Sequence, residues 1–91
     1  MDNSQPITIH VTFKNHKRLV TPKNDTYDAL MDAFLKTFAD VLHVSEEVAR
    51  CHILFQGYVP EFDDYVDIIP GQSTAGIKKI VASLDFPINR M

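Results

Sequence analysis

The order of hydrophobic patterns along the chain is its most constraining feature. Residues 7–13 alternate between apolar and polar side chains, which is typical of a strand with one buried face. A polar turn and a second strand follow, then one long amphipathic helix that begins at Tyr27, and then further strands. This order predicts an α+β fold in which the helix packs across one face of a mixed, four- to five-stranded sheet.

The first hairpin and the helix can be located from local signals. The polar turn Lys14-Asn15-His16-Lys17 precedes a returning strand predicted at Arg18 to Thr21, and Asn15 tolerates left-handed backbone angles. Asp25 is predicted to cap the helix. The helix is expected to run from Tyr27 to about Leu42, because apolar residues recur at helical spacing over this range.

The second half of the chain predicts one short helical turn and three more strands. Ser45, followed by two glutamates, indicates a capped helical turn. Cys51 to Gln56 predicts a buried strand that Gly57 stops, and an irregular acidic connection follows it. The last two strands are predicted at Tyr65–Ile69 and Ile77–Leu84. Residues 1–5 and 87–91 are predicted to be loosely held ends.

Size and composition restrict the domain organisation and the class of protein. The 91 residues, 45% of them apolar, predict a single domain over residues 1–91 with a core at about 7–84. The net charge of −3 argues against nucleic-acid binding. A single cysteine favours a reducing compartment, the cytoplasm or the nucleus. We expect no membrane association, because no apolar run approaches the roughly 20 residues of a membrane span.

The residues that could support catalysis do not form a recognisable site. The four histidines and Cys51 lack the spacing of metal ligands, and Cys51 is expected to be a buried thiol. Gly71–Lys78 lacks the lysine directly after the second glycine that a phosphate-binding loop requires. The acids near residue 64 lack the pattern of a calcium loop. We therefore expect a protein that is not an enzyme, with no catalytic residues, bound metal or cofactor.

Charge segregation is the strongest indication of function. Four of the nine basic side chains lie on or beside the first hairpin, and a group of acids surrounds a later strand. An exposed edge strand can pair with a strand of another protein, and complementary charge selects that partner. The candidate protein-binding residues are Lys14, Lys17, Arg18, Lys23, Asp63, Asp64 and Asp67.

From Ile7 to Leu84 the chain resembles ubiquitin-like β-grasp interaction domains in its element order. The segments Ile7–Val11 and Asn15–Arg18 look like Ras-binding domains, which implies binding of a small GTPase along the basic second strand. The aromatic and acidic run Phe55–Ile69 looks like DIX and Phox-and-Bem domains. That likeness implies association of copies, with a basic face of one copy against an acidic face of the next.

We therefore expect a non-catalytic adaptor or scaffold domain in signalling that binds a protein partner through its basic second strand. The partner is either another copy, bound head to tail, or a different signalling protein. One alternative is a Ras-like GTPase-binding domain. Another, from a different class, is single-stranded nucleic-acid binding with Phe13 or Tyr58 as a stacking surface.

Overall fold

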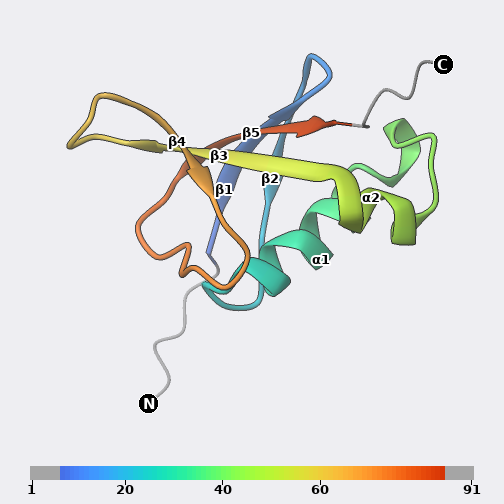
Figure 1. Ribbon diagram of the computed structural model, residues 1–91, viewed down its shortest axis with the longest axis horizontal. Helices are drawn as coiled ribbons and strands as arrows, with labels where there is room; N and C mark the ends of the chain where they lie inside the picture. Colours follow the sequence, from blue (N-terminus) through green and yellow to red (C-terminus); the bar gives the residue numbers. More distant parts are fainter. Residues whose placement is uncertain (1–6, 86–91) are drawn as a thin grey trace, which may run out of the picture.

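The computed structural model describes residues 7–85 and shows an α+β fold with a five-stranded mixed sheet and two α-helices (Figure 1). The predictions for residues 1–5 and 87–91 lie outside this range. In chain order the elements are β1 (Ile9–Phe13), β2 (His16–Val20), α1 (Tyr27–Thr37), the 3₁₀-helix η1 (Ala39–Val41), α2 (Glu46–His52), β3 (Ile53–Val59), β4 (Asp64–Ile68) and β5 (Lys79–Leu84).

The sheet has the strand order β2-β1-β5-β3-β4. β1 and β5 pair in parallel, and the other three neighbouring pairs are antiparallel. The β1–β2 turn is tight because Lys14 and Asn15 both have positive φ, at 51° and 68°, so the predicted role of Asn15 is confirmed. β2 and β4 are the outer strands, so each has one edge without a neighbouring strand in the described chain.

The core lies between one face of the sheet and the helices. Figure 1 shows α1 and α2 on the same side of the sheet. Phe34 of α1 is fully buried and packs edge-on against Phe13 and Phe55 of the sheet, with ring centroids 5.3 Å apart in both pairs. Phe38 stacks on Phe34 with a centroid distance of 4.9 Å. This aromatic cluster attaches the helix to the strands.

The prediction of one long helix is wrong, because α1 ends at Thr37 and η1 follows it. The main-chain N–H of Val41 donates to Phe38, three residues back, instead of Thr37. Phe38 and Leu42, the residues on either side of η1, are nevertheless buried. The hydrophobic spacing therefore continues after the α-helix has ended.

The predicted capped turn at Ser45 is confirmed, and it opens a longer helix than expected. The Ser45 hydroxyl accepts from the main-chain N–H of Val48 at the start of α2. Because α2 continues to His52, Cys51 and His52 belong to the helix and not to the following strand. Cys51 is exposed, so the prediction of a buried thiol is wrong.

Two other local predictions need correction. Thr26, not Asp25, caps α1: its Oγ1 accepts from the N–H of Ala29 over 3.1 Å. The carbonyl oxygen of Asp25 instead accepts from the N–H of Thr74, which joins the helix start to the β4–β5 loop. The Asp25 main chain is thus occupied by a contact between segments that are distant in the sequence.

Gly57 lies inside β3 and does not end it. A Cβ at this position would lie 2.8 Å from Cγ2 of Ile77 and 3.0 Å from Cδ1 of Ile68. The absent side chain therefore leaves the space that these two isoleucines fill. β3 continues to Val59, and the expected irregular connection is a tight turn in which Asp63 donates its N–H to Pro60.

Candidate protein-binding surface

Lys14 and Lys17 lie at the β2 side of the sheet, as the sequence predicted. Lys14 occupies the β1–β2 turn, with its Nζ 5.4 Å from the centroid of the Phe13 ring. Lys17 is exposed on β2 and lies opposite Thr12 in the register. Its side chain is on the face away from the helices, because the buried residues of β1 and β2 alternate with it. We call Lys14 and Lys17 the basic edge.

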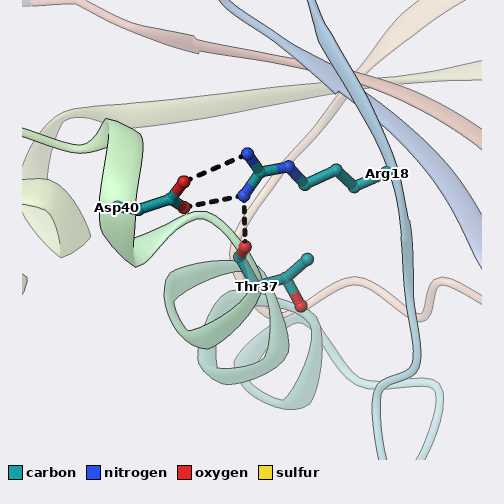
Figure 2. Close-up of polar contacts among 3 residues, drawn as sticks. All are labelled: Arg18, Thr37 and Asp40. Carbon is teal, nitrogen blue, oxygen red and sulfur yellow. Dashed lines mark hydrogen bonds and ion pairs between the residues drawn. The ribbon is translucent and has the colours of Figure 1, made fainter.

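Arg18 points to the helix side and is occupied within the same chain (Figure 2). Its guanidinium forms a bidentate pair with Asp40, through Nη1 at 2.7 Å and Nη2 at 3.2 Å, and Nη1 also donates to the main-chain oxygen of Thr37. The group also lies over the Phe38 ring, 5.2 Å from its centroid. The hydrogen bond from Arg18 lowers the pKa of Asp40, because the charged carboxylate is the form that accepts it. Arg18 therefore holds β2 against the end of α1.

Lys23 is separated from the basic edge. It lies in the loop between β2 and α1 and lines a shallow depression beside α1 that also includes Asp32 and Lys36. Asp32 forms a salt bridge with Arg50 of α2. The hydrogen bond from Arg50 is the main cause of the lowered pKa of Asp32, and the charge of Lys23 contributes less. The structure thus places Lys23 in the electrostatic surroundings of the helices.

The three predicted acids lie together around β4, and we call Asp63, Asp64 and Asp67 the acidic edge. Asp63 has a positive φ of 52° at the β3–β4 turn and accepts a 2.5 Å hydrogen bond from the Tyr58 hydroxyl. That bond raises the pKa of Tyr58, because it needs the protonated phenol. Asp67 is exposed on β4 and accepts from Gln56 over 3.1 Å.

The basic edge and the acidic edge are on opposite sides of the sheet. They border β2 and β4, which are four strand spacings apart in the order β2-β1-β5-β3-β4. At about 4.8 Å per spacing this separation is roughly 19 Å. The two groups are therefore too far apart to neutralise each other within one copy, and both are exposed to a partner.

An apolar surface that was not predicted from the sequence lies between these edges. Leu19, Leu54, Tyr65 and Val81 are exposed by 58%, 51%, 38% and 37%. Each alternates along its strand with residues that face the core, so all four lie on the face away from the helices. We call this side of the sheet the open face, because no helix of residues 7–85 covers it. The alternation in the sequence could have identified the apolar outward positions of β3 and β5.

The geometry gives little support to nucleic-acid binding, metal binding or catalysis. Phe13 is 1% exposed, so the expectation that it could stack on a nucleobase is wrong. Within residues 7–85, no three histidine, cysteine or acidic side chains lie close enough to share a metal ion. A cavity of about 470 Å³ lies at the start of α1 and is lined mainly by Asp25, Thr26 and Asp28 with the 71–73 loop. It is open to solvent.

No helix in the described part of the chain has the length and apolar character needed to cross a membrane. Comparison with known proteins finds no protein-family model, curated protein or solved structure that matches this chain. Function is therefore argued from the arrangement of these residues.

Proposed function

We propose that this chain is a β-grasp protein-interaction domain that acts as an adaptor or scaffold and binds an acidic strand of a partner along β2. The observation that carries this proposal is that β2 is an outer strand with an exposed lysine, Lys17. Unpaired main-chain groups of an outer strand can form hydrogen bonds with a strand of another chain. Lys17 would select a strand that carries carboxylates.

The β-grasp assignment is supported by the connections between the elements. An N-terminal hairpin leads into α1, and the last strand, β5, lies in parallel beside β1 at the centre of the sheet. The helices cover one face only (Figure 1). This arrangement leaves β2 at one edge, where strand addition needs no rearrangement of the core.

The binding of another copy is the most specific form of this proposal. The acidic edge of one copy supplies carboxylates on and beside an outer strand, β4, and the basic edge of the next copy supplies ammonium groups. Because the two edges are different surfaces, this contact is heterologous and adds further copies at each end. Association would therefore give open chains whose length increases with concentration.

A synthetic peptide of residues 61–69 tests the proposal directly, because it carries the acidic β4 sequence. Titration into the labelled domain should shift the amide resonances of β2 and slow their hydrogen exchange. Each exposed ion pair is worth about 0.2–1 kcal/mol, and Lys17→Glu replaces that attraction with repulsion, so this variant should weaken binding by several-fold up to about tenfold. Added salt should weaken it as well.

Lys36→Glu is the matched control, because Lys36 is an exposed lysine on α1 and its reversal should leave peptide binding unchanged. Arg18→Glu is unsuitable, because it would also break the contacts with Thr37 and Asp40. Peptide shifts that avoid β2, or equal binding by the Lys17→Glu variant, would contradict edge-strand binding. A wild-type protein that binds the peptide but remains monomeric would point to a foreign acidic partner.

A small GTPase with an acidic outer strand would be bound by the same edge of β2. The exposed acids Asp28 and Asp32 on α1 would repel such a partner if its acidic surface extended over the helix. The structure therefore gives less support to this alternative than to a partner that contacts the sheet edge alone.

A further inference from the structure

The open face has a charge pattern that is complementary to itself. One row of side chains crosses the five strands, from Lys17 on β2 through Thr12, Val81 and Gln56 to Asp67 on β4. Because the register aligns these residues, they lie at one height along the strands. The row thus begins with a positive charge, ends with a negative charge and has Val81, on the central strand, at its middle.

A twofold rotation brings the ends of this row together. If a second copy is turned by 180° about an axis that lies above β5 and runs along it, β2 of one copy lies over β4 of the other. Lys17 then faces Asp67, Thr12 faces Gln56, and Val81 faces Val81. The five-strand order makes this possible, because β5 is the central strand.

The neighbouring row agrees with the same rotation. It contains Leu19, His10 and Lys79 in register, and ends at Tyr65 on β4. Leu19 would face the Tyr65 ring, and both side chains are partly exposed in the single copy. Lys79 would lie near the axis, but its ammonium group is drawn toward Tyr58, 5.7 Å from the ring centroid. The two lysines of a pair are therefore held away from each other.

We propose that a second copy of this chain covers the open face as a twofold, face-to-face dimer in which Lys17 of each copy pairs with Asp67 of the other. This contact goes beyond the edge-strand binding proposed above and forms a closed pair instead of an open chain. Sheets that pack face to face lie about 10 Å apart and are rotated by about 30°. The long Lys17 side chain can follow its partner carboxylate through that rotation.

The expected dimer is weak. A sheet five strands wide and about five residues long presents on the order of 400 Å², so the two copies together bury about 800 Å², the size of transient interfaces. For the face-to-face contact, sedimentation equilibrium of the 91-residue chain, from about 1 μM to about 1 mM, should show a monomer that converts to a dimer and then stops growing. Growth beyond the dimer would instead indicate association of copies through the sheet edges.

Val81→Asp is the decisive variant, because it places two carboxylates at the twofold axis, two strands away from either sheet edge. It should reduce association at least tenfold. Val48→Asp is the matched control: Val48 is a valine exposed by 38%, against 37% for Val81, and it lies on α2. The control should dimerise like the wild type, and circular dichroism should confirm that both variants fold.

Charge exchange tests the proposed pairs. Lys17→Glu and Asp67→Lys should each abolish the dimer, because each places like charges at both ends of the row. The double variant should dimerise again, and an equimolar mixture of the single variants should form a heterodimer.

The failure of this proposal can be distinguished from failure of edge-strand binding. A monomeric wild type at the highest concentration, or a Val81→Asp variant that associates normally, would overturn the face-to-face dimer. Peptide binding along β2 would be unaffected by either result. Conversely, a dimer that survives Lys14→Glu and disappears with Val81→Asp would support the open face over the edge as the site of self-association.

Discussion

Arg18 Nη1 donates a 2.8 Å hydrogen bond to the main-chain oxygen of Thr37, the last residue of α1. In a continuing α-helix this oxygen would accept from the N–H of Val41, which instead donates to Phe38. A side chain of β2 thus satisfies a carbonyl that the end of the helix leaves open. The same guanidinium binds Asp40 in η1 (Figure 2), so one residue joins the edge strand, the helix end and the 3₁₀ turn.

The pairing of Asp40 with Arg18 should make stability depend on pH in the acid range. The pKa of Asp40 is lowered from 3.8, chiefly by the Arg18 hydrogen bond. Its contribution is therefore fully present above the unfolded pKa and is lost as the pH falls through the lower, folded value. We expect Asp40→Asn to be less stable than wild type at pH 7, and this difference to shrink as the pH falls below 3.8.

Urea unfolding at several pH values measures this difference. Glu61→Gln serves as a control because Glu61 is an exposed acid of the β3–β4 turn, and its effect should not follow the same course. The difference should also decrease in high salt, because the Asp40 carboxylate is exposed. A gap between wild type and Asp40→Asn that is constant from pH 7 to pH 2 would contradict the pairing.

A second prediction concerns the contribution of the core to stability. Phe34 is completely buried between three other phenylalanines, and truncation would leave a large cavity. Phe34→Ala should lower the free energy of unfolding by about 3–5 kcal/mol, which is enough to unfold many domains of this size. Asp32→Ala, at an exposed position on the same helix, should have a much smaller effect. Near-equal denaturation curves for the two variants would contradict the packing of α1 on the sheet.

The sequence allowed prediction of the elements that have strong periodicity. Alternation located β1, and the strands now called β4 and β5 were predicted to within two residues. The end of α1 could not be predicted, because Phe38 and Leu42, on either side of η1, stay buried at helical spacing. The decisive contact, from Arg18 to Thr37, comes from a strand 19 residues away.

The positions of the candidate site residues were also predicted only in part, because contacts between distant segments override local patterns. The sequence placed Lys17 at an exposed edge strand and Asp67 around a later strand, and the structure shows that these two strands are the opposite outer strands of the sheet. Arg18 was placed in the same group, yet successive side chains of a strand point to opposite faces, so Arg18 lies on the helix side, where Asp40 binds it. Cys51 was assigned to the buried strand predicted at Cys51 to Gln56. The capped helix that begins after Ser45 extends through Cys51, so the strand begins only at Ile53.

Cys51 should react in the native protein. Its side chain is exposed in the last turn of α2, so a thiol reagent reaches it without unfolding. We expect the native labelling rate to lie within about tenfold of the rate in denaturant, and Cys51→Ser to abolish labelling. Labelling that occurs only when the domain unfolds would show that the thiol is buried and that α2 ends earlier.

A final prediction concerns Thr74, the one buried polar residue of the described chain. Its main-chain N–H donates to Asp25, but its Oγ1 is buried without a hydrogen-bond partner. Leaving a buried polar group unsatisfied costs about 1–3 kcal/mol. Thr74→Val keeps the shape and the main-chain bond and removes this cost, so stability should be unchanged or should rise by up to about that amount.

The same substitution at Thr26 is the matched control, because its Oγ1 caps α1 by accepting from the N–H of Ala29. Thr26→Val should lower the free energy of unfolding by about 0.5–2 kcal/mol. Thr74→Val should leave that free energy unchanged or raise it, so the two variants should differ by at least the loss seen with Thr26→Val. Urea denaturation of both variants beside the wild type measures this. If Thr74→Val destabilises the domain as much as Thr26→Val, the Thr74 hydroxyl has a bonding partner in solution, and the β4–β5 loop is held to the helix start by more than the Asp25 main chain.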